Sequence, residues 1–294
     1  MSIAIIINPV AGGIPPGQAR ARAELASAVV ASCGERADVF VTERRGHARE
    51  LAQAAVLGGA RCVLAWGGDG TLNEVTCALA FQPVPLGIIP AGSGNGLARE
   101  LGVDFRPERA IAEALRASPR AIDLGEVNGR LFANVAGVGI DAFIAEEFDR
   151  RGSNRRGFSG YVAVAAKALF TYRPRHYAIA TPAGRFESRA ILVTIANSAQ
   201  FGNGARIAPD ARVDDGRLDL VVVEERARWR TVCSLPRLFN GTLAGMQGCS
   251  IRQIERTTIE SNQPMVFHVD GEPVDGGTRL EVRVHPAALQ VAVR

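Results

Sequence analysis

The chain has 294 residues, which is long for a single hydrophobic core and predicts two domains. Hydrophobic residues make up 47% of it and charged residues 22%, as in an ordinary soluble globular protein, and the formal net charge is only +4. So small an excess argues against a nucleic-acid partner. Because Lys167 is the only lysine, arginine carries almost all of the positive charge, and its planar guanidinium suits phosphates and anionic lipid headgroups.

The cysteines and the apolar runs indicate a cytoplasmic protein. Five cysteines without a CxxC pair argue against a disulfide framework or a zinc site, and thiols are typical of a reducing compartment. The N-terminal apolar run ends at Ile7 and predicts a first strand rather than a signal peptide. Because no apolar stretch approaches the ~20 residues that span a bilayer, we expect membrane contact to be limited to the protein surface.

Short apolar runs alternate with helix-like stretches in the first part of the chain. The stretches rich in Ala, Leu, Glu and Arg predict helices at residues 18–33, 48–57 and 72–80. The apolar runs predict strands at residues 4–7, 39–41, 62–66 and 86–89. This alternation is typical of an α/β domain, in which helices cover both faces of a parallel sheet and ligands gather at the carboxyl ends of the strands.

The pattern changes after about Ile122. Segments such as "LFANVAGVGI", "LDLVVVE" and "MVFHVDGEPV" predict strands joined by turns, with helical pieces around residues 161–170 and 228–239. Strands in this arrangement favour an antiparallel sandwich or barrel. We therefore expect an α/β domain over residues 1–121 and a β-rich domain over residues 122–294.

The stretch "VLAWGGDGTLNEV", residues 63–75, places a glycine-rich turn between a strand and a helix. Amides of Gly67, Gly68 and Gly70 can approach phosphate oxygens closely, and the following helix adds its positive N-terminal end. A Walker A loop is excluded because the sole lysine lies elsewhere. Asp69 would repel a phosphate unless it holds Mg²⁺ or accepts a proton from an attacking hydroxyl, and both roles indicate phosphoryl transfer. The structural alternative is a tight turn with an aspartate cap.

Two acidic motifs in the second half also have a structural alternative. "VDGEPV" places Asp270 and Glu272 at a turn between strands, where the carboxylates could act as base and metal ligand or could simply cap the turn. "ARVDDGRLDL" offers Asp214, Asp215 and Asp219 to a hard cation, or forms an Asp-Gly hairpin. "NVAGVGIDA" scans as a dinucleotide fingerprint, but no acidic residue follows at the spacing that a ribose needs.

Several motifs in order resemble the diacylglycerol kinase catalytic family, which includes bacterial lipid kinases, sphingosine kinases and ceramide kinases. They are "INPVAGG", "TERRGHARELA", "GGDGTLNEV", "GIIPAGSGNGLARELG", "NVAGVGIDA", "VDDGRLDL" and "HVDGE", and together they cover nearly the whole chain. The resemblance implies a Rossmann-like N-terminal domain, similar to phosphofructokinases and NAD kinases, followed by a β-sandwich, with ATP and Mg²⁺ bound.

The resemblance also implies roles for individual residues. Asp141 is expected near the lipid headgroup, and Asp215 is expected to bind Mg²⁺ with the backbone carbonyls of Arg212 and Arg217. In bacterial relatives the glutamate matching Glu272 is the proposed general base, whereas sphingosine kinases assign that role to the aspartate matching Asp69. The residues expected to line the ATP site are Asn8, Thr42, Gly67, Gly68, Asp69, Gly70, Thr71, Asn73 and Ser93.

Two features depart from this picture or extend it. Many bacterial members carry an aspartate where this chain has Gly96, so the lipid acceptor stays open; Gly96 could equally relax a turn. In residues 150–175, arginines lie on both sides of a short apolar segment. This pattern fits a core helix or a segment that docks on an anionic bilayer.

We therefore expect an ATP- and Mg²⁺-dependent lipid kinase that acts on a diacylglycerol-like or sphingoid-like lipid. It would be cytoplasmic and peripheral at the inner face of an anionic membrane, and a homodimer is compatible with the sequence. The alternatives are an NAD kinase, which shares GGDG, and a nucleotide- or membrane-binding module without catalysis.

Overall fold

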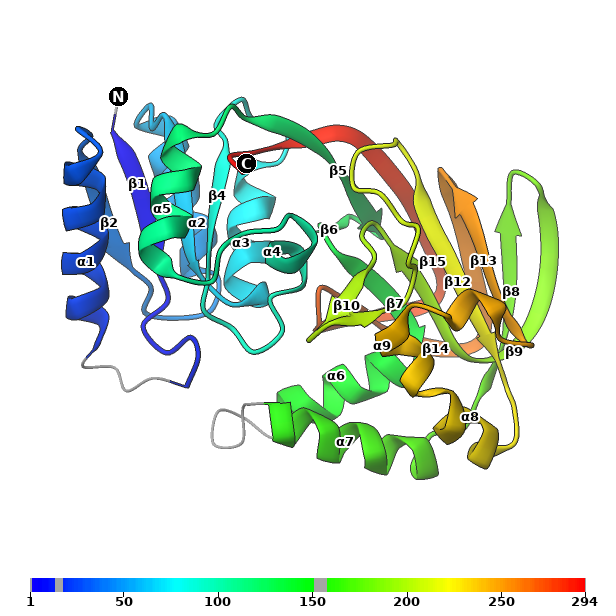
Figure 1. Cartoon of the computed structure of the whole chain (residues 1–294). Helices are drawn as coiled ribbons and strands as arrows, with labels where there is room; N and C mark the ends of the chain where they lie inside the picture. Colours follow the sequence, from blue (N-terminus) through cyan, green and yellow to red (C-terminus); the bar gives the residue numbers. More distant parts are fainter. Residues whose placement is uncertain (1, 14–17, 151–157, 294) are drawn as a thin grey trace. The chain divides into compact units, whose positions relative to one another are not determined.

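The computed structural model describes residues 2–13, 18–150 and 158–293, which form two compact units (Figure 1). Unit 1 runs to Ile122 and also contains the residues from Ala287 onward, whereas unit 2 is Asp123–Pro286. The last residues return to unit 1 because strand β15 (Glu272–Val291) ends beside β4, where the Ala292 amide donates to the Leu86 carbonyl. The second domain expected from the sequence, residues 122–294, therefore differs from unit 2 by the residues after Pro286, which belong to unit 1.

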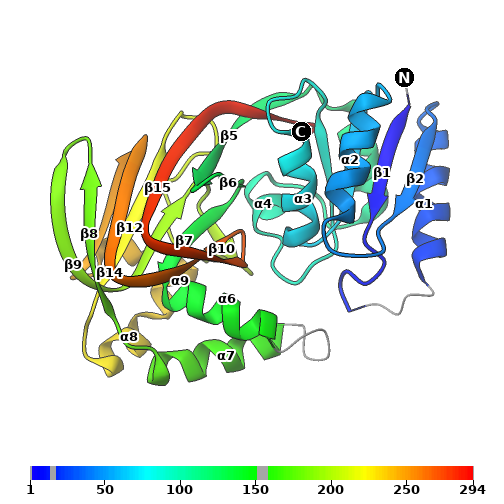
Figure 2. The same cartoon turned by 180° about the vertical axis from the view of Figure 1, so that it is seen from behind.

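Unit 1 contains a parallel sheet in the order β4-β3-β1-β2. Its strands are β1 (Ile3–Ile7), β2 (Ala37–Val41), β3 (Cys62–Gly67) and β4 (Leu86–Pro90). Its helices are α1 (Ala19–Ser32), α2 (His47–Leu57), α3 (Asp69–Leu79), α4 (Gly96–Glu100) and α5 (Pro107–Arg116). Helices α1 and α5 cover one face, and α2 and α3 cover the other, as the two opposite views show (Figure 2).

Burial on both faces explains why these strands are continuous apolar runs. All five residues of β1 are buried, and alternate residues Ile3, Ile5 and Ile7 pack with Ala26 and Val30 of α1. Strand β2 is at the edge and is only partly buried, as its mixed sequence indicates. The helix and strand positions expected in this half agree with the structure to within a few residues.

Unit 2 is built mainly from antiparallel strands. Their bounds are β5 (Arg120–Val127), β6 (Arg130–Phe132), β7 (Val135–Gly139), β8 (Arg175–Thr181), β9 (Gly184–Ala196), β10 (Gln200–Gly202), β11 (Ala205–Arg206), β12 (Leu218–Glu224), β13 (Cys249–Ile254), β14 (Arg256–Val269) and β15. Phe132, Tyr177 and Phe267 are fully buried in the main core. The antiparallel pairing predicted for this half is confirmed.

Helices lie beside these strands, and the first was not expected from the sequence. They are α6 (Ile140–Arg150), α7 (Phe158–Thr171), α8 (Arg228–Ser234), α9 (Pro236–Asn240) and the 3₁₀ turn η3 (Leu243–Gly245). Helix α7 packs Val164 and Ala168 against Ile140 and Ile144 of α6. The core-helix alternative therefore holds for this part of α7, while the arginines of residues 151–157 lie outside the described residues.

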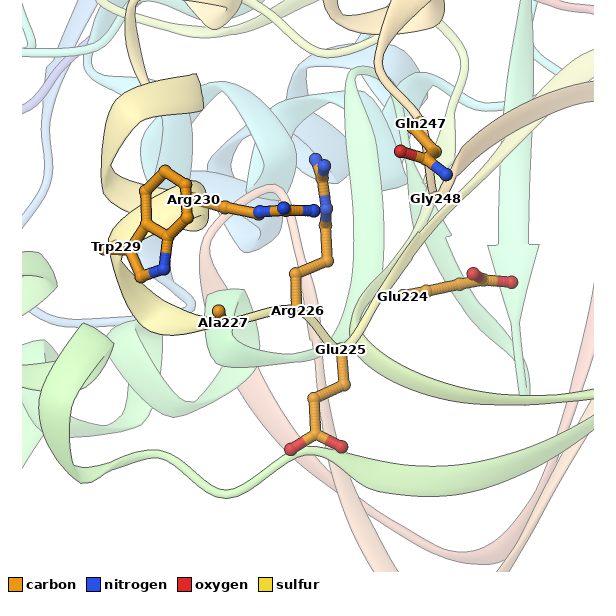
Figure 3. A pocket seen from close by; sticks show the side chains of 8 residues that line it. All are labelled: Glu224, Glu225, Arg226, Ala227, Trp229, Arg230, Gln247 and Gly248. Carbon is orange, nitrogen blue, oxygen red and sulfur yellow. The ribbon is translucent and has the colours of Figure 1, made fainter.

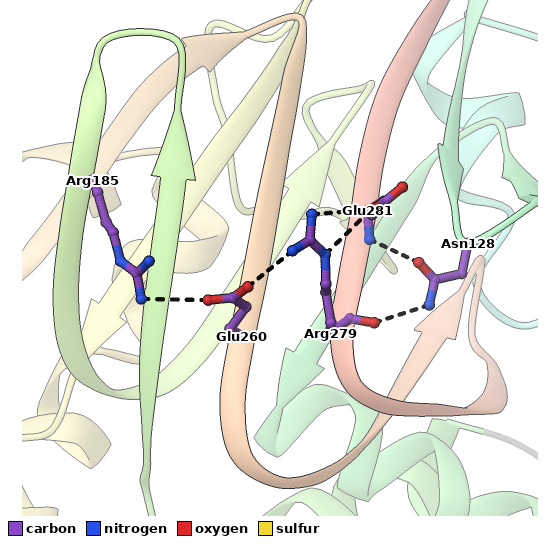
Figure 4. A network of polar contacts seen from close by, with 5 residues as sticks. All are labelled: Asn128, Arg185, Glu260, Arg279 and Glu281. Atoms are coloured by element: carbon purple, nitrogen blue, oxygen red, sulfur yellow. Dashed lines mark hydrogen bonds and ion pairs between the residues drawn. The ribbon is translucent and has the colours of Figure 1, made fainter.

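A chain of exposed polar contacts crosses strands β9, β14 and β15 (Figure 4). Glu260 accepts bonds from Arg185 and Arg279, and Arg279 also pairs with Glu281. Asn128, in the β5–β6 turn, accepts from the Glu281 amide at 2.7 Å. Because solvent screens such exposed pairs, we expect them to help fix the register of the strands and to add little to the free energy of unfolding.

Two simpler expectations concern the cysteines and membrane spans. All five cysteines are thiols rather than disulfides. Among the residues that the structure describes, no helix has both the length and the hydropathy needed to cross a membrane.

Candidate active site

The first part of the site lies where β1 and β3 end in unit 1. The Asn8 amide donates to the Trp66 carbonyl, which joins the two strand ends, and the Asn8 side chain donates to Thr71 Oγ1 at 2.8 Å. The Val10 amide in turn donates to Asn8 Oδ1, as in an Asx turn. Asn8 therefore shapes its own turn and also reaches the first turn of α3.

The glycine loops after β3 and β4 pack backbone against backbone. A Cβ atom on Gly92 would lie 2.6 Å from the Gly68 Cα, and one on Gly67 would lie 2.5 Å from the Thr71 Cβ. A side chain on Gly92 would push the two loops apart, and one on Gly67 would displace Thr71. The glycines thus have a packing role, and their contact with phosphate stays a prediction.

Asp69 links the two loops. Its carboxylate accepts the Asn95 amide at 2.9 Å and the Gly96 amide at 2.8 Å, so it caps the start of α4. Asn95 is in the left-handed region, with φ of 50°, and its side chain bonds both the amide and the carbonyl of Gly92. The acid in this loop therefore binds backbone amides, which is how the turn tolerates it.

The other residues expected at the ATP site lie at the same strand ends. Thr71 and Asn73 are buried in the first turns of α3, and Ser93 is exposed in the second glycine loop. Thr42 follows β2, is buried, and donates its amide to the Ile7 carbonyl. Their contact with ATP stays a prediction.

Two structural residues of unit 1 had no signal in the sequence. Arg22 of α1 is buried, lies over the Trp66 ring, and donates to the carbonyls of Asn8 and Ala11; burial lowers the pKa of its guanidinium. Glu74 of α3 accepts the amides of Gly46 and Ala48 at the start of α2. An arginine and a glutamate on polar helices have no local pattern that marks such partners.

In unit 2, the turn between β14 and β15 is held by hydrogen bonds to the segment that leads into β7. Asp270 is in the left-handed region, with φ of 48°, and its carboxylate accepts the amides of Ala133, Asn134 and Val135 at 2.9–3.0 Å. Glu272 is the next residue but one, the first of β15, and it is half-buried. The turn-capping alternative therefore describes Asp270, and Glu272 follows it on a fixed backbone.

A buried polar cluster lies beneath this turn. His268 Nδ1 accepts the Gly271 amide at 3.3 Å, so the Nε2 atom carries the hydrogen that it donates to Asp141 Oδ2 at 3.1 Å. Thr194 also donates to Asp141 Oδ2 at 3.1 Å, and Asp141 Oδ1 accepts the Ala142 amide. Asp141 is 5% exposed. Its expected contact with a lipid headgroup stays a prediction, while its observed partners support the turn.

The predicted metal ligands lie in the loop before β12. The Asp215 carboxylate accepts the Arg217 amide at 3.0 Å and faces the Gln253 amide at 3.4 Å. Burial, with Asp215 and Asp210 nearby, raises the pKa of Asp219 to about 6. Mutual repulsion of the carboxylates at this loop would be relieved by a cation, so their chemistry fits a divalent ion, while the participation of the Arg212 and Arg217 carbonyls stays a prediction. Across the described part of the chain, no group of three His, Cys, Asp or Glu side chains is arranged to hold a metal by itself.

The chain is similar to known proteins over both units. Residues 2–127 match the family model of the diacylglycerol kinase catalytic domain, and residues 134–293 match that of the YegS C-terminal NAD kinase beta sandwich-like domain. A protein of Pseudomonas savastanoi pv. phaseolicola named "Probable lipid kinase YegS-like" is 33% identical over 86% of this chain and 83% of its own. One of the same name from Pseudomonas aeruginosa is 31% identical over 94% and 91%.

Solved structures show the same fold. A crystal structure of a proposed diacylglycerol kinase from Bacillus anthracis has a TM-score of 0.81 at 20% identity, and covers 100% of this chain and 97% of that one. Another Bacillus anthracis structure, named as a diacylglycerol kinase, has a TM-score of 0.75 at 19% identity, with the same coverage. A fold of two domains, the second β-sandwich-like, is thus supported both by family models and by structures.

Proposed function

The chain belongs to the diacylglycerol kinase catalytic family, as its motifs indicated, with relatives named as YegS-like lipid kinases. From this premise we propose that it transfers the γ-phosphate of ATP to a lipid hydroxyl. The acceptor would be a diacylglycerol-like or sphingoid-like lipid, and the products its phosphate monoester and ADP. Atoms and charge balance if the hydroxyl loses its proton to a carboxylate as the oxygen attacks phosphorus.

One observation carries the nucleotide half of this proposal: two glycine loops, at the ends of adjacent parallel strands, pack with no room for a Cβ atom between Gly68 and Gly92. Loops packed this way present backbone amides, and the first leads into the 11-residue helix α3, whose N-terminal end favours anions. The Asn8–Thr71 bond orients a hydroxyl at the same place. This arrangement supports a triphosphate site at the carboxyl ends of β1, β3 and β4.

The hydrogen bonds also distinguish between the two candidate bases. Both oxygens of Asp69 already accept backbone amides, and these bonds favour its ionised form and would weaken if it took up a proton. Glu272 instead starts a strand directly after a turn clamped by Asp270 and His268. We therefore assign the general base to Glu272 and the placement of the second glycine loop to Asp69.

The metal of the proposal is Mg²⁺ at the Asp215 loop. Bound there with the backbone carbonyls of Arg212 and Arg217, it would supply positive charge to a loop that carries several carboxylates. Asp123 supports the loop by accepting the Gly216 amide at 2.6 Å.

Phosphorylation with labelled ATP tests the function. The purified protein is given ATP, Mg²⁺ and, separately, diacylglycerol, sphingosine, ceramide, phosphatidylglycerol or NAD, and the products are separated by thin-layer chromatography. We expect a labelled lipid phosphate from diacylglycerol or sphingosine. Label in NAD alone would replace this proposal by an NAD kinase. ATP binding without ADP release on any acceptor would indicate a non-catalytic module.

A further inference from the structure

The exposed apolar side chains of unit 2 gather on one group of helices. Phe170 at the end of α7 is 62% exposed, Trp229 of α8 is 64% exposed, and Phe239 of α9 is 58% exposed. Val232 and Leu235 lie between them and are also exposed. Within the part of unit 2 that the structure describes, no other large hydrophobic side chain is exposed to this degree.

Four of these side chains, Trp229, Val232, Leu235 and Phe239, form a stripe along one side of a nearly continuous helix. Leu235, between α8 and α9, has helical dihedrals, and the spacing of residues 229, 232, 235 and 239 is that of one helical face. Neither helix contains a buried residue, and Leu238 packs on the core from the other side. The apolar side of this helical segment, residues 228–240, thus faces away from the protein that supports it.

The same part of the chain is basic. Residues 226–254 contain five arginines and no aspartate or glutamate, in a protein whose net charge is only +4. Within the described residues, Arg226, Arg228 and Arg230 form no ion pair. By contrast, three arginines on the strands of unit 2, Arg185, Arg189 and Arg279, each pair with a glutamate.

A hollow of about 390 Å³ opens beside the stripe, lined by residues 224–227, 229, 230, 247 and 248 (Figure 3). The side chains of Arg226 and Arg230 converge over it, whereas the Glu225 side chain points away and pairs with Arg189 at 2.8 Å. Glu224 is the second acid on its wall. Arg230 also lies over the Trp229 ring, 5.1 Å from its centroid, which keeps a positive charge beside the indole.

We propose that this surface, formed by Phe170, the α8–α9 stripe and the arginines around it, docks the protein on an anionic lipid bilayer. Tryptophan with arginine is typical of the membrane–water interface, where the indole reaches the acyl boundary and guanidinium groups bind lipid phosphates. A protein partner would not require unpaired positive charge around an apolar stripe. This inference rests on the proposed function only in that a lipid kinase must reach a substrate whose acyl chains stay in the membrane.

Vesicle binding tests the surface directly. Co-sedimentation compares the full chain with the variants Arg226→Gln/Arg230→Gln and Trp229→Ser/Phe239→Ser on vesicles of phosphatidylcholine, with or without phosphatidylglycerol. We expect wild type to prefer anionic vesicles and the arginine variant to bind them roughly 30-fold more weakly at low salt, from two lost contacts. The apolar variant should lose binding to a similar extent. Wild-type binding by either variant overturns the proposal, as does failure of wild type to bind anionic vesicles.

Matched controls remove equal charge and apolar area elsewhere. Arg185→Gln/Arg256→Gln removes two exposed arginines from the strands of unit 2, and Leu57→Ser removes a side chain that is 89% exposed in unit 1. Both controls should bind like wild type, and an equal loss in the control pair would overturn the assignment to α8–α9.

Tryptophan fluorescence gives an independent measurement. The protein has two tryptophans, and Trp66 is only 3% exposed, so a blue shift on adding anionic vesicles reports Trp229. We expect that shift in wild type and its absence in Trp229→Phe. A shift that survives in Trp229→Phe would overturn the proposal.

The activity measurement separates this proposal from the function itself. On a short-chain diacylglycerol dissolved as monomers, the arginine variant should match wild type, but on bilayer-embedded diacylglycerol it should be slower by the same factor as its binding. Equal loss on both substrates would overturn the docking role and leave the kinase intact. If no lipid is phosphorylated while the variants still lose vesicle binding, the proposed function fails and the docking surface stands.

Discussion

Asp69 illustrates how a single residue in a conspicuous motif can have a structural partner that the motif does not reveal. The glycine loop places a carboxylate where a phosphate is expected, and the structure shows that this carboxylate bonds the amides of Asn95 and Gly96. One acid therefore joins two glycine loops that are separated by more than 20 residues in the chain. We expect catalysis to depend on Asp69 through loop position and on Glu272 through proton transfer.

Glu272→Gln and Asp69→Asn should therefore fail in different ways. We expect Glu272→Gln to lower kcat by at least 100-fold, because an amide cannot accept the proton, while ATP affinity and thermal stability stay unchanged. Asp69→Asn turns one oxygen into an NH₂ group that opposes a backbone amide, and should destabilise unit 1 by about 1–3 kcal/mol and weaken ATP binding. Steady-state kinetics, calorimetric ATP titration and thermal melts measure these effects. Wild-type turnover by Glu272→Gln would contradict the assignment of the base.

Asp215 and its neighbour Asp214 form a matched pair for testing the metal. Mg²⁺ should raise the melting temperature of the wild-type protein, because the ion binds the folded loop and not the unfolded chain. We expect Asp215→Asn to lose this increase and Asp214→Asn, an exposed residue that pairs with Arg212, to keep it. Thermal melts with and without excess Mg²⁺ give the answer, and an equal increase in all three proteins would refute the Asp215 site.

At the scale of single elements, the start of α2 depends on a residue from another helix. Glu74 accepts the amides of Gly46 and Ala48, so α3 supplies the cap that the α2 segment lacks in its own sequence. Glu50, in the first turn of α2, instead pairs with Arg44 at the surface. The two glutamates therefore differ in stabilising effect although both lie near the same helix end.

Glu74→Ala should destabilise the protein by about 1–2 kcal/mol, because two amides lose their acceptor. Glu50→Ala should change the free energy of unfolding much less, because the ion pair with Arg44 is exposed to solvent. Urea unfolding followed by circular dichroism compares them. If both substitutions lower the free energy of unfolding equally, the loss in Glu74→Ala does not come from the cap.

The turn between β14 and β15 is likewise fixed by contacts from other strands. In Asp270→Asn, the asparagine tolerates the left-handed backbone but its side chain cannot accept all three amides. We therefore expect the free energy of unfolding to fall by about 1–3 kcal/mol. Because Glu272 follows this turn, kcat should fall while the KM for ATP changes little. Asp275→Asn, on an exposed position of β15, is the control and should change neither quantity. Unchanged kcat in Asp270→Asn would show that Glu272 does not depend on the clamp.

At the scale of the whole molecule, the chain passes between the units in β5 and in β15, and Glu126 ties these two strands together within unit 2. Its carboxylate accepts Arg283 at 2.9 Å and His285 at 2.7 Å. Burial alone would raise the pKa of Glu126, but hydrogen bonds from Arg283 and His285 outweigh burial and lower it from 4.5. The folded state thus holds this proton less tightly than the unfolded state does.

Stability from Glu126 should therefore be complete above the unfolded pKa of about 4.5 and be lost as pH falls through the lower, folded pKa. We expect Glu126→Gln to be less stable than wild type by about 1–3 kcal/mol at neutral pH, and this difference to shrink below about pH 4.5. Denaturant unfolding across this range measures it. The control Glu281→Gln removes a carboxylate that is 69% exposed and should show little difference at any pH. A Glu126→Gln difference that grows on acidification would contradict the sign.

The sequence by itself determined the features that depend on neighbouring residues. Apolar runs and helix-like stretches predicted the four strands of unit 1, its helices α1, α2 and α3, and the antiparallel strands of unit 2, whereas no helix was predicted at α5. The motifs taken together indicated the kinase family by resemblance. These signals are legible because burial on one or both faces imposes a repeat on adjacent positions. Helix α6 was missed because its start follows a buried glycine-rich strand without a stop signal.

The tertiary structure alone decided which side chains meet. The partners of Asp69, Glu74, Asp141 and Asp270, the return of the residues after Pro286 to unit 1, and the outward face of α8–α9 all depend on how distant segments come together. A carboxylate that caps a distant helix looks the same in sequence as one that awaits a substrate. Only the register and topology that place a particular amide within 3 Å of it distinguish the two.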